Sequence, residues 1–251
     1  TPFYKKALPI LQAKEMRVHE RVAQTLYANT YTNEITLESL GIEKQEFLFD
    51  FDIHRQIENF KARLDSYSQE RDFLDKDASS DLSVALRFGL VSIGEVYRSV
   101  DGLEGGEAFI RQLIFRDFYA YLLFHFPHLQ THNHKGRFNG VENEVLFETF
   151  CTAQTGVPII DAGVRELLST GKMHNRVRMV VASFFTKDLL LPWQWGERFF
   201  AQYLLDYDAA SNILSWQWSA GTGIDPQPYF RVFNPYLQSK KFDKDAEYIK
   251  R

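Results

Sequence analysis

The chain contains a single cysteine, Cys151, among 251 residues. One thiol excludes an internal disulfide and an iron–sulfur cluster held by several cysteines, and it is typical of a reducing compartment. The longest apolar run, near residues 179–191, is interrupted by Lys187 and Asp188 and is too short to span a membrane. No signal peptide is visible, and the first residue is Thr1. We therefore expect an intracellular protein without a membrane partner: cytoplasmic, or nuclear in a eukaryote.

The chain also lacks a strong excess of one charge. Its 29 Lys and Arg against 33 Asp and Glu give a formal net charge of −4, which argues against a protein that coats nucleic acid over its whole surface but allows a local basic patch. P-loop, GxSxG and HExxH motifs are absent. Gly102, Gly105 and Gly106 follow no strand pattern and lack dinucleotide-binding spacing. Hydrolase, kinase and Rossmann-type interpretations are therefore unsupported.

Period-2 alternation is nearly absent, whereas helical periodicity runs through most of the chain. Helices are predicted over residues 1–30, 47–63, 82–90, 107–124, 142–154, 158–168, 177–191 and 195–205, with an irregular or short helical segment at 67–77. Pro127, Gly171 and Pro192 are expected to end or separate helices. The residues from Pro226 onward are predicted to be rich in turns. The sequence therefore predicts an all-α fold.

Residues 78–81, Ala-Ser-Ser-Asp, directly precede the apolar run from Leu82 to Leu90. Serine and aspartate are good helix N-caps, and a cap is the simpler interpretation. A helix N-terminus with nearby hydroxyls also suits a phosphate or pyrophosphate. The residues alone leave both interpretations open.

Residues 171–235 form the most informative stretch and hold all four tryptophans. Arg176 and Arg178 are two residues apart and point in different directions on a helix. One of them is expected to pair with Asp206 or Asp208, and the other to stay free for a surface anion. Together these groups suit a pocket for a flat ligand with polar edges.

Aromatic and histidine residues in this region also have simpler interpretations. Trp216 and Trp218 are expected to point to different sides of their segment, and burial in the core explains each of them as well as a ligand does. Four histidines share a short loop-like region: His125, His128, His132 and His134. Because their spacing crosses a proline and a loop, we expect surface histidines there and no metal site.

Many segments resemble the FAD-binding domain of the photolyase/cryptochrome family. They are TPFYKKAL, YSQERDF from Tyr67, LSVALRFGLVS from Leu82, IFRDFYAYL from Ile114, GVPIIDAGVREL from Gly156, TGKMHNRVRMVVASFFTKDLLLPW from Thr170, GERFF, LLDYDAASN, WQW and TGIDPQPYFRVFNP. The resemblance implies a monomeric, multi-helix FAD-binding domain over residues 1–251, with a helical lead-in at 1–66 and a flavin- and DNA-binding core at 67–251. It also implies that the family's α/β antenna domain, with its own chromophore, belongs to the same parent protein and is missing from this sequence.

The resemblance assigns residues to two sites. The flavin site would use Tyr67, Ser79, Ser80, Asp81, Leu82, Ser83, Phe109, Gln112, Arg116, Tyr119, Asn175, Arg178, Asp206, Asp208 and Asn212. DNA would contact Phe115, Lys172, Asn175, Arg176, Met179, Trp218 and Gln238. Arg178 paired with Asp206 would flank the flavin ring, and Asn212 would face its reactive nitrogen.

In the implied reaction, reduced FAD donates an electron under light to a cyclobutane pyrimidine dimer in UV-damaged DNA, the dimer splits, and the electron returns. The lesion is flipped out of the duplex. Trp216 and Trp193 match the first two members of the family's electron chain, and Asn212 and Gln112 would also serve catalysis. Relatives that repair (6-4) photoproducts have histidines at the positions of Asn175 and Met179, so the residues here favour cyclobutane-dimer repair.

Four positions depart from the family pattern. Gln112 replaces a dimer-binding glutamate and cannot transfer a proton. Phe115 and Lys172 replace tryptophans of the family. No tryptophan lies near Gly140, where the third tryptophan of the electron chain is expected. Trp195 or a tyrosine is the hypothetical exit of this chain, and normal photoreduction in a Trp195→Phe variant would exclude Trp195. The departures keep open an alternative function, a cryptochrome-like blue-light photoreceptor without repair activity.

Overall fold

The structure, a computed structural model, describes residues 2–13, 36, 38–41, 52–136, 139–226, 228 and 230–251. These residues form helices joined by loops, with no strand among them, which confirms the predicted all-α fold. The α-helices are α1 (Pro2–Ala13), α2 (Ile53–Lys61), α3 (Tyr67–Glu70), α4 (Ser83–Phe88), α5 (Ile93–Val100), α6 (Gly106–His125), α7 (Glu144–Cys151), α8 (Pro158–Thr170), α9 (Asn175–Ser183), α10 (Trp193–Tyr203), α11 (Ala209–Ala220), α12 (Pro235–Phe242) and α13 (Glu247–Lys250). Two 3₁₀ turns, η1 (Glu38–Leu40) and η2 (Pro127–Gln130), and a π-helical turn, η3 (Phe184–Asp188), complete the set.

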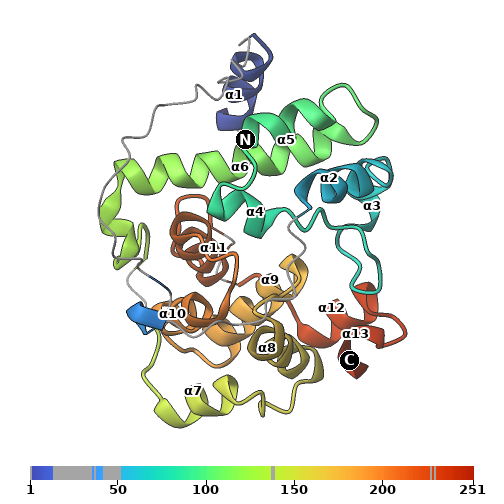
Figure 1. The fold of residues 1–251 in the computed structure, drawn as a ribbon. Coiled ribbons are helices and arrows are strands. Elements are labelled where there is room, and N and C mark those ends of the chain that lie inside the picture. Colours follow the sequence, from blue (N-terminus) through green and yellow to red (C-terminus); the bar gives the residue numbers. More distant parts are fainter. Residues whose placement is uncertain are drawn as a thin grey trace.

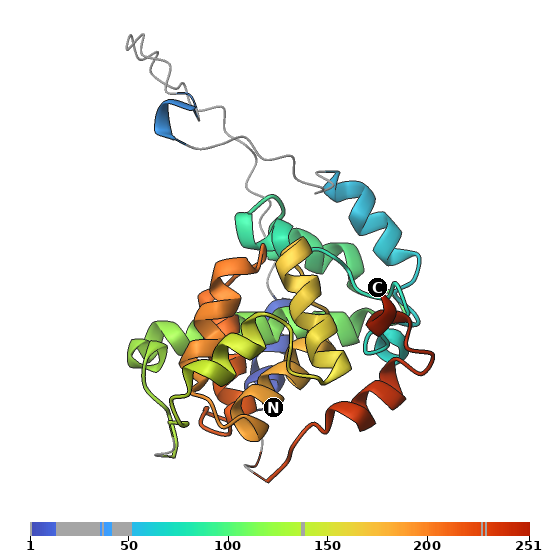
Figure 2. The same cartoon turned by 90° about the horizontal axis from the view of Figure 1, so that it is seen from below.

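The 20-residue helix α6 organises the packing. It contacts α1 and α5 and, with another part of its length, α11 (Figure 1). Helix α11 in turn packs against α9 and α10, and α8 packs against α9. The C-terminal helices α12 and α13 lie on α8, beside the segment that follows α3, in both views (Figures 1 and 2). Helices α9 and α11 are therefore neighbours at the centre of the fold.

Two large groups of buried apolar side chains stabilise this arrangement. In the first, the rings of Phe60, Tyr67 and Phe109 meet edge to face, with centroids 4.6 to 5.5 Å apart. In the second, the indole of Trp216 packs edge-on against Phe185 at 5.4 Å and Phe200 at 5.0 Å. Such aromatic pairs add to the stabilisation that burial of their apolar area provides.

Gly196 allows α10 to approach Trp216 closely. A β-carbon at this position would lie 2.2 Å from Cη2 of the indole, which no side chain tolerates. Since Trp216 is 2% exposed and surrounded on its other sides, it has no room to move away. The glycine therefore fixes how α10 and α11 pack.

Several sequence predictions are confirmed. The helix predicted at residues 107–124 is α6, and Pro127 follows its end. Gly171 ends α8 in the left-handed conformation, with φ of 68°, and its N–H donates to the Leu167 carbonyl at 2.9 Å. Trp216 is buried, whereas Trp218, two residues later on α11, is only partly buried. The two indoles thus differ in burial, although both border the cavity described below.

Other predictions are wrong in their local detail. No side chain caps α4: Leu82 occupies the N-cap position, and the Ser80 hydroxyl accepts weakly from the Leu82 N–H at 3.4 Å. The tail from Pro226 is not only turns, because Asn234 caps α12 through the Leu237 N–H at 3.0 Å. The continuous helix predicted at 177–191 is α9 followed by the π turn, and neither α5 nor α11 was predicted.

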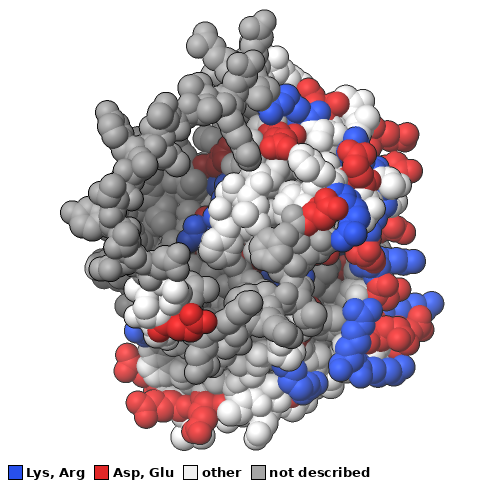
Figure 3. Space-filling model, viewed as in Figure 1, with Lys and Arg blue, Asp and Glu red and all other residues white. Residues whose placement is uncertain are grey.

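The predicted helices at residues 1–30 and 47–63 fall partly outside the described residues; their described parts contain α1 and α2. None of the described helices combines the length and apolar character needed to cross a bilayer. Along the right-hand side of the view in Figure 3, basic and acidic side chains lie side by side.

Candidate functional site

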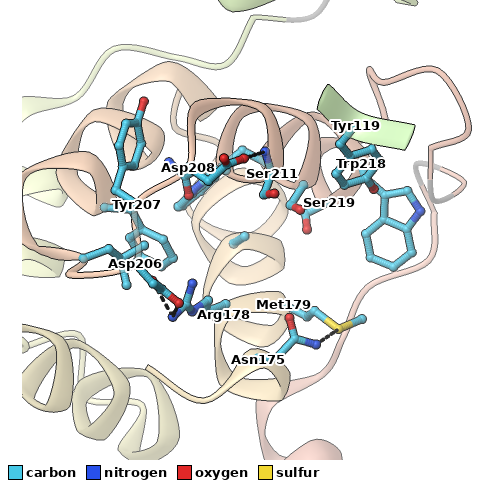
Figure 4. Close-up of a pocket in the computed structure, with 16 residues that line it drawn as sticks. Tyr119, Asn175, Arg178, Met179, Asp206, Tyr207, Asp208, Ser211, Trp218 and Ser219 are labelled. Carbon is cyan, nitrogen blue, oxygen red and sulfur yellow. Dashed lines mark hydrogen bonds and ion pairs between the residues drawn. The ribbon is translucent and has the colours of Figure 1, made fainter. Parts of the chain in front are cut away.

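A cavity of about 280 Å³ lies between α9 and α11 (Figure 4). Of the residues assigned from the sequence, those that line it are Tyr119, Asn175, Arg178, Met179, Asp206, Asp208, Asn212, Trp216 and Trp218. Phe200 and Leu204 add apolar surface from α10 and its C-terminal end. The stretch from residue 171 to 235 thus supplies nearly the whole wall.

Arg178 and Asp206 form an ion pair at one end of the cavity. Nη2 of Arg178 lies 3.0 and 3.1 Å from the two carboxylate oxygens, and Nε donates to the Met173 carbonyl at 2.8 Å. The side chains are 28% and 12% exposed, so solvent screens the pair only in part. The Leu205 N–H donates to the Gly171 carbonyl at 2.9 Å and holds the backbone next to Asp206. This confirms that one arginine of the pair faces an aspartate of the stretch.

Asp208 ends the loop and begins α11. Its Oδ1 accepts from the Ser211 N–H at 2.9 Å, and its Oδ2 lies 3.9 Å from Nη2 of Arg116 on α6. A carboxylate at a helix N-terminus is stabilised by the unpaired N–H groups there. Asp208 therefore fixes the start of α11 against α6, and Arg116 lies behind the cavity wall.

Asn212 is oriented by a glutamate that the sequence analysis missed. Its Nδ2 donates to the main-chain carbonyl of Glu197 at 3.2 Å and to Oε1 of the same residue at 3.0 Å. Both amide hydrogens are thereby used, so the side-chain oxygen is the group left to accept a hydrogen bond in the cavity. Glu197 is 8% exposed. Its position within the apolar helix from Trp193 to Tyr203 was the available signal.

Tyr207 completes this network. Its hydroxyl donates to Oε1 of Glu197 at 3.1 Å. Burial, together with the nearby Glu197 carboxylate, raises the pKa of Tyr207 to about 12. The phenol therefore stays protonated and keeps Glu197 as an acceptor at neutral pH.

Three serines on α11 were also missed. Ser211, Ser215 and Ser219 all line the cavity (the first and last are labelled in Figure 4). Their spacing of four residues puts the hydroxyls on one face of the helix. That spacing was visible in the sequence and predicts a polar stripe among apolar residues.

The other end of the cavity carries Asn175, Met179 and Trp218. Asn175 and Met179 lie one turn apart on α9, and Nδ2 of the amide is 3.8 Å from the thioether sulfur. Trp218 faces them from α11 (Figure 4). It also borders a smaller cavity of about 60 Å³, which Phe115 and Tyr119 line as well. Phe115 therefore lies next to Trp218, outside the main cavity.

Arg176 contradicts the expectation of a free arginine. Its Nη2 pairs closely with Asp72, its guanidinium lies 4.5 Å from the ring centroid of Phe242, and its side chain is 15% exposed. The short segment after α3 supplies the aspartate, a partner that the spacing of the two arginines does not reveal. Arg176 thus joins α9 to α12 and to the segment after α3.

His174 precedes both arginines and caps α9. Its Nδ1 accepts from the Arg176 N–H at 3.1 Å. Burial is the main cause that lowers the pKa of His174, and the neighbouring Arg176 and Arg178 act in the same direction, opposed by Asp72. The imidazole is therefore held in the neutral form that the cap requires.

The remaining assigned residues do not line the main cavity. Tyr67, Leu82 and Phe109 are buried in the first core. Gln112 turns back on its own helix, where Nε2 donates to the Ala108 carbonyl at 3.3 Å. Away from the wall also lie Ser79, Ser80, Asp81, Ser83, Lys172 and Gln238. Their roles in binding stay predictions.

Helix α4 nevertheless lies close to the cavity wall. Nε of Arg87, in its last turn, donates to the Tyr207 carbonyl. Ahead of α4, Nη2 of Arg63 donates to the Ser79 carbonyl at 3.1 Å, and the Ser79 hydroxyl donates to Asp81 at 2.9 Å. The segment at residues 79–83 is therefore held in a fixed shape between α2 and the cavity.

The tryptophans assigned to electron transfer are deeply buried. Trp216 and Trp193 are each 2% exposed, and the Trp193 N–H donates to Oδ1 of Asn133 at 2.8 Å. At Gly140, a β-carbon would lie 2.5 Å from the Pro192 nitrogen, so no tryptophan fits there. Trp195 packs edge-on against Phe147 at 5.2 Å and is partly exposed.

His125, His128, His132 and His134 are all exposed. Among the described residues, no group of three or more histidine, cysteine, aspartate or glutamate side chains is arranged to hold a metal ion.

Comparison with known sequences identifies the family. A family model described as the FAD binding domain of DNA photolyase matches residues 109–251. The chain belongs to this family. It is 44% identical over 197 residues to a deoxyribodipyrimidine photo-lyase of Agrobacterium fabrum, covering 75% of this chain and 41% of the relative. It is 40% identical over 223 residues to that of Vibrio cholerae, covering 84% of this chain and 48% of the relative.

Solved structures of the photolyase family share the fold. A class III photolyase from Agrobacterium tumefaciens matches with a TM-score of 0.75 and 41% identity, covering 79% of this chain and 43% of that one. A Synechocystis cryptochrome matches with a TM-score of 0.77 and 30% identity, covering 83% of this chain and 48% of that one. A Sulfolobus tokodaii photolyase, crystallised with two FAD molecules, matches with a TM-score of 0.75 and 40% identity. The match covers 84% of this chain and 49% of that one. The photolyase-type domain described here thus spans less than half the length of these relatives.

The cavity fits the ring system of the family's cofactor, FAD. A flavin has flat apolar faces and an edge of alternating donors and acceptors. The cavity offers Phe200, Leu204 and Trp216 as apolar surface. It offers the Arg178 guanidinium as a donor and the Asn212 oxygen as an acceptor. The chemistry of the wall therefore suits this cofactor.

Proposed function

We propose that this domain holds FAD between α9 and α11 and uses it for light-driven repair of cyclobutane pyrimidine dimers in DNA. The observation that carries the proposal is the division of one cavity into two chemically different ends. We call Arg178, Asp206, Asp208 and Asn212 the flavin end. We call Asn175, Met179 and Trp218 the lesion end.

The flavin end would hold the isoalloxazine ring. The Arg178 and Asp206 pair provides a donor and an acceptor side by side, and the oxygen of Asn212 accepts an N–H from the ring. Glu197 keeps that oxygen turned toward the cavity because it occupies both amide hydrogens. Tyr67, Phe109, Gln112, Arg116 and the segment at residues 79–83 would complete the site, the last of them near the pyrophosphate. Reduced FAD supplies the light-absorbing electron donor.

The lesion end would receive the flipped dimer. Trp218 and Met179 provide apolar surface for stacking, and Asn175 provides an amide whose groups suit the carbonyl and N–H edge of a pyrimidine. Phe115, beside Trp218, extends the apolar wall. The flipped dimer would thus lie directly against the flavin, within reach of a transferred electron.

Other residues would contact the DNA backbone and carry electrons. Lys172, Arg176 and Gln238 are proposed DNA contacts, with Arg176 acting while it remains paired to Asp72. Trp216 and Trp193 would reduce the flavin, and Trp195 is the proposed exit because its ring reaches the surface. We further propose a monomer that acts inside the cell and is joined in its parent protein to an antenna domain.

The alternative is a blue-light photoreceptor of the cryptochrome type. The position of Gln112 favours it, since its amide turns back to the Ala108 carbonyl, away from the lesion end. The fold alone does not discriminate, because a cryptochrome structure matches as well as the photolyases do. Asn175, Met179 and Trp218 at one end of the cavity favour repair.

A direct test uses the chain loaded with fully reduced FAD and an oligonucleotide with one cyclobutane dimer. Repair predicts that blue light restores the intact oligonucleotide, with none restored in the dark. Binding of the dimer without restoration would support the photoreceptor. Absence of flavin absorbance after reconstitution would exclude both functions.

A further inference from the structure

Lys187 lies in the π-helical turn η3, which ends α9 inside the second core. The wide turn is defined by the hydrogen bond from the Leu189 N–H to the Phe184 carbonyl, 3.0 Å long and five residues apart. The Thr186 hydroxyl, which is buried, donates to the Ala182 carbonyl at 2.7 Å. π turns are rare and occur frequently at functional sites. This one is built into the core and is not a frayed helix end.

The turn holds a segment that we call the strap, defined as residues 228 and 230–233. Nζ of Lys187 donates to the Arg231 carbonyl at 2.7 Å and to the Pro228 carbonyl at 3.4 Å. One residue before the turn, the hydroxyl of buried Ser183 accepts from the Phe233 N–H at 3.1 Å. No other side chain bonds to the strap's backbone among the described residues. Two side chains, four residues apart in the sequence, thus tie the strap to the core.

The strap borders the lesion end. The ring of Phe233 stacks on the indole of Trp218, with centroids 6.2 Å apart and planes inclined by 29°. Beyond this contact the strap is open to solvent: Phe230 is 86% exposed and Val232 is 43% exposed. The ring of Phe233 is itself buried in the second core, at 9% exposed, whereas the exposed Phe230 has little packing of its own. The backbone ties therefore decide where the outer part of the strap lies.

The ammonium group of Lys187 is suited to this role. It is half-buried, and burial lowers its pKa, an effect that Arg231 reinforces and Asp188 opposes. A charged donor makes stronger hydrogen bonds to carbonyls than a neutral one does. Without the ammonium group, the carbonyls of Pro228 and Arg231 would lose their side-chain hydrogen-bond donor.

We propose that Lys187 is a positioning residue for damaged DNA: it fixes the strap against Trp218, so that the duplex around a flipped dimer meets a preformed wall. The inference rests on the proposed function, because that function supplies the DNA. Lys187 acts through the strap's backbone and need not touch a phosphate.

Three variants test the inference in the FAD-loaded chain. Lys187→Met keeps the length of the side chain and removes the donor. Lys187→Arg restores a charged donor, and Lys187→Gln is polar but too short to reach both carbonyls. Lys61→Met is the matched control, since it removes the same charge from an exposed ion pair with Glu58 on α2.

The first measurement is hydrogen exchange without DNA. We expect the Phe233 N–H to exchange about tenfold faster in Lys187→Met, with a smaller rise in Lys187→Gln and none in Lys187→Arg or Lys61→Met. A direct phosphate contact would leave exchange in DNA-free protein unchanged. Unchanged exchange in both Lys187→Met and Lys187→Gln would overturn the inference.

The second measurement is affinity for a dimer-containing oligonucleotide. We expect Lys187→Met to bind about tenfold more weakly, and Lys187→Arg to recover most of the affinity. Faster exchange of the Phe233 N–H in Lys187→Met, with unchanged affinity for the dimer-containing oligonucleotide, would overturn the role of Lys187 in DNA binding. If wild-type protein binds no dimer while exchange still responds to Lys187, the proposed function fails and the tie between Lys187 and the strap stands.

Discussion

The flavin end and the lesion end of the cavity differ in how firmly the protein holds their side chains. At the flavin end, Arg178 makes three hydrogen bonds of 2.8 to 3.1 Å, and the amide of Asn212 makes two. At the lesion end, Asn175 has only a 3.8 Å contact to the sulfur of Met179. The two ends face each other across one small cavity, so the difference is local.

This difference matches the two proposed occupants. A resident cofactor is best held by a preorganised set of donors and acceptors, because no binding energy is then spent on ordering them. A lesion that enters and leaves is better met by adaptable groups, and methionine is the most adaptable apolar side chain. The rigid end therefore suits FAD, and the looser end suits a transient nucleotide.

The largest effect is expected at the flavin end. Asp206→Asn breaks the pair and leaves the Arg178 guanidinium unpaired. Loss of one partner from a fully buried pair costs about 3 to 5 kcal/mol; because Arg178 is 28% exposed, we expect about 2 kcal/mol, or about thirtyfold weaker FAD binding. Fluorescence titration of flavin-depleted protein measures it. Asp72→Asn breaks the other pair, outside the cavity, and should leave FAD affinity unchanged.

The next effect concerns the lesion end. Trp218→Ala should weaken binding of a dimer-containing oligonucleotide about tenfold, since stacking of a base on an aromatic side chain contributes about 1 to 3 kcal/mol. FAD affinity should stay at the wild-type value. Competition with an undamaged oligonucleotide separates lesion recognition from backbone binding. Equal losses for both oligonucleotides would assign Trp218 to the backbone and remove the distinction between the ends.

A third variant tests the wall that the two ends share. Gly196→Ala places a β-carbon against Trp216 and should destabilise the chain by about 1 to 3 kcal/mol despite the better helix propensity of alanine. Urea unfolding measures the change. Arg198→Ala, at an exposed position of the same helix, should change stability by less than about 0.5 kcal/mol. Equal stabilities for the two variants would show that α10 can move away from the indole.

The smallest effect is a pH dependence from His174, which caps the helix that supplies both ends. Its pKa is lowered from 6.5 in the folded state, so the unfolded chain binds more protons between the two values. The free energy of unfolding should therefore fall as pH decreases from about 6.5 toward the folded-state pKa. His174→Asn retains a capping group and should flatten this slope. An unchanged slope between the two proteins would exclude His174 as its source.

The sequence predicted the all-α fold and most of the cavity wall. Helix α6 and the end of α8 at Gly171 were predictable because periodicity and glycine chemistry act locally. The residues alone left the arginine's partner open between Asp206 and Asp208, and motif resemblance named the pair of Arg178 with Asp206. The resemblance also added Asn212 and Met179. The helix ends need no knowledge of how distant segments pack, and the motifs replace that knowledge for the ion pair.

Most of the missed features depend on such packing, whereas the serine stripe of α11 was visible in its four-residue spacing. Asp72 meets Arg176 only because the segment after α3 lies beside α12. Glu197 reaches Asn212 only because Gly196 lets α10 approach α11. The cap predicted for α4 failed because Ser79 bonds to Asp81 instead of the helix. The first two outcomes are set by tertiary neighbours, and the third by a competing local hydrogen bond.

The most direct test of the account is the fluorescence lifetime of reduced FAD bound to this chain. Electron transfer to a dimer requires the lesion end to lie against the flavin, so a saturating dimer-containing oligonucleotide should shorten the lifetime, and an undamaged one should not. Trp218→Ala should raise the concentration of dimer-containing oligonucleotide needed for saturation, without changing the flavin lifetime at saturation. An unchanged lifetime with the dimer fully bound would contradict the shared cavity.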